Sequence, residues 1–256
     1  MTSLPIHYLL PIYPGFQLLD LAGPLDILNI LSTAHLDPEK HPLSLTFIAE
    51  TLEPVPTKPI PPKSANWTFD LVDAYPSSGG KTNLSFNEYL QPDTTFADFL
   101  RALELDQGKP HVDVLLIPGG VGTRLKRVHP DGNKTSNIQS LLEFLPMVAP
   151  HIRTAIITVC TGSDALAQTG LLDNRRATTN MTRFKEVAAR SPKVKWADFA
   201  RWVRRISAGM DVTLAFISHF YGGQGVARSL AKALEYDWRE IAEGERDPLY
   251  AKHFAT

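Results

Sequence analysis

The stretch VDVLLIPGGVG at residues 112–122 decides the fold class of this chain. Its first six residues are apolar except for Asp113, a pattern that predicts a strand buried on both faces of a parallel sheet. Pro118, Gly119 and Gly120 then end the strand and leave backbone N–H groups exposed at its carboxyl end. Open α/β sheets place their ligands at that edge, so the turn is a candidate binding site. A plain strand-to-helix turn is the alternative.

A second stretch, TAIITVCTGSD at residues 154–164, has the same organisation. A β-branched strand stops at Cys160, and Gly162 permits a sharp entry into a helix. This resembles a nucleophile elbow, although the glycine expected two residues before the nucleophile is here Thr158. A thiol at a helix N-terminus is expected to ionise more easily. A lone cysteine is more commonly a small buried apolar residue, but its position on the turn itself favours a nucleophile.

A third stretch, YPGFQLLDLAGP at residues 13–24, carries Asp20 between leucines. Ionising a carboxyl group in such apolar surroundings is costly without partners, so we expect Asp20 to accept hydrogen bonds from amides or to stay protonated. An N-cap of the helix that follows, over residues 21–31, is an equally good interpretation.

Short β-rich runs alternate with helical patterns along the rest of the chain, which predicts a doubly wound, mostly parallel α/β sheet flanked by helices, of the flavodoxin-like kind. We expect one domain over residues 1–256, with a proline-rich excursion at about 51–92, since five of the twenty prolines fall within residues 51–66. The expected strands are 6–13, 43–50, 112–117 and 153–160, and the expected helices are 16–32, 94–105, 136–148, 161–171, 181–190, 209–221 and 224–241.

Composition excludes several classes of protein. Lys plus Arg number 26 against 27 Asp plus Glu, so the net charge of -1 gives no overall attraction to nucleic acid or to an anionic membrane. No apolar run reaches the ~18 residues of a membrane span, and the N-terminus lacks the basic region of a signal peptide, so a cytoplasmic protein is expected. One cysteine and no metal-type histidine spacing predict no disulfide and no metal site. The dinucleotide fingerprint fails at Leu125, which predicts no such cofactor.

Taken together, these stretches resemble the ThiJ/PfpI superfamily, which has the class I glutamine amidotransferase-like fold, and within it the isocyanide (isonitrile) hydratase branch. The resemblance covers roughly residues 5–50 and 110–241. It rests on the three stretches above and on four later motifs, namely GLLD at 170–173, RATT at 176–179, SAGMD at 207–211 and EYDW at 235–238.

The resemblance implies a role for each site residue. Cys160 would be the nucleophile, Asp20 the acid/base carboxyl group, and Thr161 would lie against the reacting group. Gly120 and Val121, with Gly119 in the same turn, would supply backbone donors of the oxyanion-hole type. The implied enzyme is a lyase that hydrates an isonitrile to an N-substituted formamide as a homodimer, without metal or organic cofactor.

Two departures from common superfamily patterns bear on the chemistry. Many members have a histidine directly after the cysteine, where this chain has Thr161, and hydratase-type relatives often have one where this chain has Asn180. Asn180 cannot act as a base, so protease, amidotransferase and triad-dependent glyoxalase chemistry lose support. Asp20 in place of the superfamily's usual glutamate favours the hydratase.

Two alternatives remain open. The first is a glyoxalase or deglycase acting on 2-oxoaldehydes, with His219 as the late candidate for a base. The second is a redox-responsive protein or a degenerate paralogue. The degenerate form is suggested because about ten residues are missing, relative to similar sequences, from the hairpin before Ser207.

Overall fold

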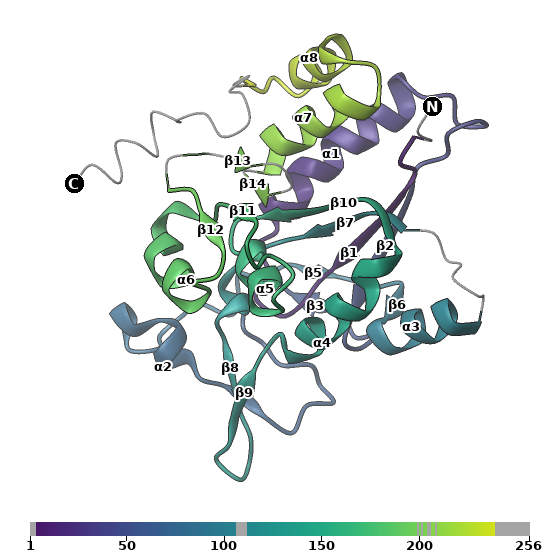
Figure 1. Ribbon diagram of the computed structural model, residues 1–256. Helices are drawn as coiled ribbons and strands as arrows, with labels where there is room; N and C mark the ends of the chain where they lie inside the picture. The colour runs from purple at the N-terminus through teal and green to yellow at the C-terminus, as the bar shows by residue number, and fades with distance from the viewer. Residues whose placement is uncertain are drawn as a thin grey trace.

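The structure is a computed structural model that describes residues 4–105, 112–198, 200, 202–203, 206–207 and 209–238. A seven-stranded sheet forms its centre, in the order β13-β14-β10-β7-β1-β2-β6 (Figure 1). The strands are β1 His7–Pro11, β2 Ser44–Ala49, β6 Thr94–Thr95, β7 Val112–Ile117, β10 Ile152–Val159, β13 Trp202–Val203 and β14 Ile206–Ser207. All neighbouring strands are parallel except β13 and β14, so the predicted doubly wound, mostly parallel sheet is confirmed.

The central strand β7 is buried along its whole length, as its apolar sequence predicts. Its one charged residue, Asp113, is 6% exposed. The Asp113 carboxylate accepts hydrogen bonds from the backbone N–H groups of Ile6 (2.8 Å) and His7 (3.0 Å). Buried carboxylates require such partners, and this one fixes the start of β1 against β7.

Helices cover both faces of the sheet (Figure 1). On one face lie α1 Leu19–Ala34, α7 Gly209–Phe220 and α8 Gln224–Ala233, with α1 and α8 packed on α7. On the other lie α3 Phe96–Leu105, α4 Gln139–Val148 and α5 Gly162–Gln168. A further helix, α6 Phe184–Arg190, stands beside the two-residue strands β11 Arg176–Ala177 and β12 Lys195–Trp196. The principal predicted strands and helices are therefore present, and most of their ends differ by a few residues. The prediction of a last helix over 224–241 was wrong in length: α8 ends at Ala233, and Glu235 shortly after it has the left-handed φ of 51° that breaks the helix.

The proline-rich excursion contains short strands that the sequence did not reveal. Strand β3 Val55–Pro56 pairs with β5 Tyr89–Leu90, while β4 Thr68–Phe69 joins β8 Lys126–Val128 and β9 Lys134–Ser136 in a small antiparallel sheet. A short helix, α2 Leu71–Ala74, and the 3-10 turn η1 Pro76–Ser78 follow β4.

Buried Arg127 on β8 holds this region together. Its guanidinium forms an ion pair with Glu50 and lies 4.3 Å from the centre of the Trp67 ring. It also donates a hydrogen bond to the backbone carbonyl oxygen of Asn137.

The shortened segment before Ser207 still forms a hairpin. Trp202 pairs with Ser207 and Val203 with Ile206, and β14 extends the sheet beside β10. The connecting residues, Arg204 and Arg205, lie outside the described residues.

Candidate active site

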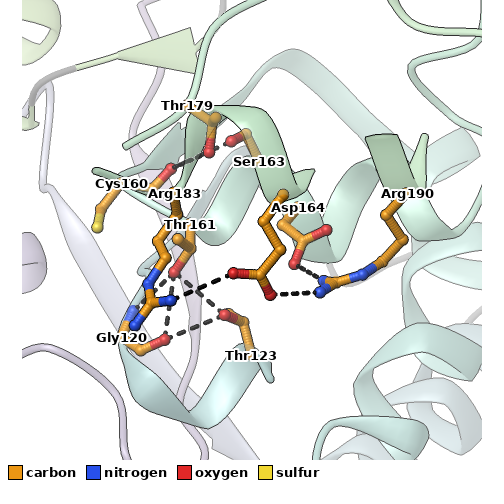
Figure 2. A network of polar contacts seen from close by, with 10 residues as sticks. Gly120, Thr123, Cys160, Thr161, Ser163, Asp164, Thr179, Arg183 and Arg190 are labelled. Atoms are coloured by element: carbon orange, nitrogen blue, oxygen red, sulfur yellow. Dashed lines mark hydrogen bonds and ion pairs between the residues drawn. The ribbon is translucent and has the colours of Figure 1, made fainter. Parts of the chain in front are cut away.

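Cys160 lies on a sharp turn between β10 and α5. Its backbone has φ 54°, in the left-handed region that residues with a side chain rarely adopt. Gly162 makes the turn possible, because a Cβ atom there would lie 2.3 Å from the Ile117 carbonyl oxygen. The hydroxyls of Ser163 (3.1 Å) and Thr179 (3.3 Å) donate to the Cys160 carbonyl oxygen (Figure 2). The predicted nucleophile elbow is thus present in the backbone.

Asp20 reaches this turn from the first turn of α1. Its Oδ2 accepts a hydrogen bond from the Gly119 N–H at 2.9 Å, and the carboxyl group lies close enough to the Cys160 thiol for each group to shift the pKa of the other. Helix α1 begins at Leu19, so Asp20 is inside the helix and is not its N-cap. Of the two interpretations of Asp20, the structure supports the amide-bound carboxyl group.

Burial raises the pKa of both ionisable groups of the site, the Asp20 carboxyl group and the Cys160 thiol. Burial raises the pKa of the Asp20 carboxyl group to about 6, although the bonds to Gly119 and Cys160 lower it. Burial and the nearby Asp20 charge together raise the pKa of the Cys160 thiol to about 11. At neutral pH the pair therefore holds an ionised Asp20 and a protonated Cys160. The helix N-terminus was expected to favour a thiolate; burial and Asp20 outweigh that effect.

Asn180 contacts the sulfur directly. Its Nδ2 lies 3.3 Å from the Cys160 Sγ, while its Oδ1 accepts hydrogen bonds from the N–H (3.0 Å) and the hydroxyl (2.6 Å) of Thr182. These two bonds fix the amide so that its NH₂ group faces the sulfur. The Asn180 bond lowers the pKa of the Cys160 thiol, as does a bond from the Thr161 N–H. Both donors would stabilise negative charge on the sulfur.

The glycine turn after β7 packs against the cysteine turn without room for side chains. A Cβ atom on Gly119 would lie 2.4 Å from the Thr161 nitrogen, and one on Gly120 would lie 2.4 Å from the Gly15 carbonyl oxygen. Gly120 also has φ +126°, a conformation that favours glycine. Three loops, at residues 15–20, 119–121 and 160–162, therefore meet backbone to backbone, which is why both glycines are needed.

The predicted backbone donors have different partners. The Gly119 N–H donates to Asp20, and the Gly120 N–H donates to the Thr161 hydroxyl at 3.0 Å. The Thr123 hydroxyl lies 3.1 Å from the Thr161 hydroxyl and 3.0 Å from the Gly120 carbonyl oxygen (Figure 2). Over the described residues, the Val121 N–H has no protein acceptor. The structure thus brings all the predicted site residues together, and Val121 is the donor available to a ligand.

A charged network that sequence reasoning missed lies beside this site (Figure 2). Buried Asp164, at the start of α5, forms an ion pair with Arg190, which also pairs with Glu186 at 2.8 Å. Glu186 in turn pairs with Arg183 at 3.3 Å. Arg183 lies three residues after Asn180, in the 3-10 turn η4 Met181–Arg183. No signal in the sequence joins residues of α5 and α6 in this way.

His219 is remote from the thiol. It is exposed near the C-terminal end of α7, where its ring packs on Phe220. The site-proximal end of this helix is Gly209, which lies against Val159. At 1.5 Å per residue, His219 is about 15 Å further along the helix. None of the groups that shift the pKa of Cys160 is a histidine.

Within the part of the chain that the structure describes, no three His, Cys, Asp or Glu side chains are grouped so as to hold a metal ion. In the same part, no helix is both long and apolar enough to cross a membrane.

Comparisons with known proteins agree with the predicted superfamily at the level of the fold. No family model matches the chain. Isonitrile hydratase of Pseudomonas putida is 29% identical over 178 residues, which are 70% of this chain and 53% of that protein. The chain therefore spans about half the length of the curated relative that it matches.

Solved structures with similar folds have low sequence identity. A ThiJ/PfpI family protein from Pseudomonas syringae has a TM-score of 0.57 at 18% identity, covering 100% of this chain and 88% of its own. A DJ-1 superfamily protein from Salmonella typhimurium has a TM-score of 0.55 at 16% identity, with coverages of 91% and 100%. An AraC family transcriptional regulator from Pseudomonas putida has a TM-score of 0.56 at 16% identity, with coverages of 90% and 100%. The chain has the ThiJ/PfpI and DJ-1 fold, which is shared by proteins of different functions.

Proposed function

We propose that this protein is an isonitrile hydratase-like lyase that converts R–N≡C to an N-substituted formamide, with Cys160 as nucleophile and Asp20 as acid/base. The observation that carries the proposal is the Cys160–Asp20 pair, in which a buried thiol with its pKa raised to about 11 lies beside a buried carboxyl group with its pKa raised to about 6. Addition to an isonitrile needs a nucleophile and a proton at the same carbon, and this pair supplies both. The 29% identical hydratase supports the same chemistry.

The first half of the reaction forms a covalent intermediate. Asp20 takes the thiol proton as the Cys160 sulfur attacks the terminal carbon of the isonitrile. The Asp20 carboxylic acid then delivers that proton to the same carbon, which gives the thioimidate R–N=CH–S–Cys160. No group leaves, so all atoms of the substrate are retained. The N–H groups of Thr161 and the Asn180 amide stabilise the sulfur as negative charge develops on it.

The second half releases the product. Asp20, again ionised, accepts a proton from a water molecule as the water adds to the thioimidate carbon. Asp20 passes this proton to the nitrogen. It then takes the hydroxyl proton as the carbonyl forms and the C–S bond breaks, and gives that proton to the departing sulfur, leaving R–NH–CHO and the thiol. The Val121 N–H, which has no acceptor among the described residues, is the donor we assign to the substrate. The enzyme would need no metal and no organic cofactor.

Neither alternative has comparable support. Glyoxalase chemistry requires a histidine near the thiol. His219 is about 15 Å along α7 from Gly209, the end of the helix nearest the site. A redox sensor requires an exposed cysteine with a lowered pKa, whereas burial raises the pKa of Cys160. We further propose a homodimer acting on a small-molecule substrate in the cytoplasm, as the superfamily resemblance implies.

The proposal is tested by following formamide production from a simple aromatic isonitrile. Purified protein is compared with Cys160→Ala, and with Cys160→Ser as a variant of nearly equal size. We expect turnover by the unaltered protein, none by the alanine variant, and a loss of several orders of magnitude in the serine variant, because a hydroxyl is a much weaker nucleophile. Undiminished turnover in Cys160→Ala would refute the mechanism, and absence of turnover in all three would refute the function.

A further inference from the structure

Arg124 is a half-buried cation beside the candidate active site with no partner of its own. It follows directly after the 3-10 turn η2 Val121–Thr123, whose last residue contacts Thr161. Its backbone N–H donates to the Val121 carbonyl oxygen at 3.1 Å, which fixes where its side chain begins. Across the described ranges, no carboxylate and no hydrogen-bond acceptor contacts its guanidinium group. A half-buried guanidinium without an acceptor is unusual, because its five donors have lost part of their hydration.

The neighbouring charges leave this cation uncompensated. The two carboxylates of the neighbouring network, Asp164 and Glu186, are both used in ion pairs with Arg183 and Arg190. Burial lowers the pKa of Arg124, and the positive charge of Arg183 lowers it further. The carboxylate of Glu186 and the Tyr75 side chain act in the opposite direction but do not prevent the shift. Half-buried Arg124 therefore has a like charge in its neighbourhood, that of the more exposed Arg183.

Both cations belong to segments that contact the turn carrying the reacting thiol. Arg124 is near enough to Cys160 that a thiolate there would raise the pKa of Arg124. Arg183 lies three residues after Asn180, whose amide contacts the sulfur. Tyr75, from the proline-rich excursion, packs with Val121 and Leu125 around the same turn. The two arginines are thus placed on both segments that flank the thiol, at residues 121–124 and 180–183.

We infer that Arg124, assisted by Arg183, binds a carboxylate group of the substrate, so that the substrate is an isonitrile carrying a carboxylate. The inference rests on the proposed hydratase function and adds the substrate class to it. A guanidinium fork binds a carboxylate through two parallel hydrogen bonds. The bound carboxylate would satisfy the donors of Arg124 and would relieve its repulsion from Arg183. Water would enter at the isonitrile end, and the product would be an N-formylamino carboxylate.

The test compares 3-isocyanopropanoate with its methyl ester, which presents the same isonitrile carbon without the negative charge. We expect the unaltered protein to favour the carboxylate. Arg124→Gln should raise KM for the carboxylate by about 10- to 100-fold, the usual effect of losing a hydrogen bond to a charged group, and should change KM for the ester by less than about threefold. Arg183→Gln should raise KM for the carboxylate by a smaller factor, because the Arg183 side chain is more exposed.

Arg153→Gln is the matched control. Arg153 is exposed on β10, but it lies seven residues before Cys160, about 23 Å along an extended strand. The Arg153→Gln variant should leave the preference for the carboxylate over the methyl ester unchanged. If Arg124→Gln instead lowered kcat/KM for acid and ester equally, Arg124 would act only on the Cys160 charge, and the inference would be wrong. It would be equally wrong if the unaltered protein did not prefer the carboxylate.

A binding measurement separates failure of this inference from failure of the hydratase function. Calorimetry would compare N-formyl-β-alanine, the expected product, with its methyl ester, on the unaltered protein and on Arg124→Gln. Selective binding of the acid that weakens at least tenfold in the variant would support the carboxylate site even if neither isonitrile is turned over. Equal binding of acid and ester, or no binding of the acid, would overturn it.

Discussion

Replacing Asp20 by asparagine should change thiol reactivity and turnover in opposite directions. The Cys160 thiol has its pKa raised from 9.0 to about 11, with burial as the larger cause and the Asp20 charge as the second. About 0.1% of such a thiol is ionised at pH 8. If Asp20 accounts for half of the increase, removing its charge raises the thiolate fraction about tenfold, equivalent to ~1.4 kcal/mol.

The assay measures the rate of Cys160 alkylation by iodoacetamide at pH 8 beside the rate of isonitrile hydration. In Asp20→Asn, alkylation should be about tenfold faster, whereas hydration should fall by ~10²–10⁴-fold through loss of the acid/base group. Asp26→Asn is the matched control, because Asp26 is exposed on the same helix, and it should change neither rate. Alkylation of Asp20→Asn that is no faster than that of the unaltered protein would refute the assigned effect of Asp20 on the thiol.

Three further changes follow from the same geometry. The value of kcat/KM should rise as the pH increases through about 6, because Asp20 must lose its proton to act as the base; a rate independent of pH between 5 and 7 would contradict this. Thr161→Val removes the acceptor of the Gly120 N–H and a partner of Thr123, so denaturant unfolding should show a loss of about 1–3 kcal/mol, and an unchanged midpoint would contradict the network. Gly119→Ala places a Cβ atom 2.4 Å from a backbone nitrogen, so it should cost about 1–3 kcal/mol and lower hydration activity more than stability alone explains, whereas unchanged activity would show that the loop contact is dispensable.

The sequence predicts the central sheet because its strands are apolar, and the middle strand β7 is buried along its whole length. In β7 and β10 the apolar runs are long enough to be recognised without knowing their neighbours, and the glycines that follow mark where each strand ends. Asp20 and Cys160 were found because each departs from its local pattern: a carboxyl group among leucines and a thiol on a turn. Asn180 was found only through the family resemblance, as an amide where hydratase-type relatives often have a histidine.

The excursion could not be predicted in the same way. Strand β4 is two residues long and pairs with β8, where Thr68 lies opposite Val128. A two-residue strand has no periodicity, and its partner is about sixty residues away, so nothing local indicates the pairing. The same reason hid the pairing of Asp164 with Arg190. Such contacts depend on the completed fold, and so does the raised pKa of the Cys160 thiol, since burial is its largest cause.

The central claim is that Cys160 and an isonitrile form a covalent thioimidate, and intact-mass measurement of quenched reactions tests it most directly. Because no group leaves, the protein should gain the full mass of the isonitrile, and peptide mapping should place that mass on Cys160. The adduct should form and decay with the kinetics of formamide release, and Cys160→Ala should show no adduct. Formamide release without an adduct in rapidly quenched samples, together with turnover in Cys160→Ala, would contradict the account.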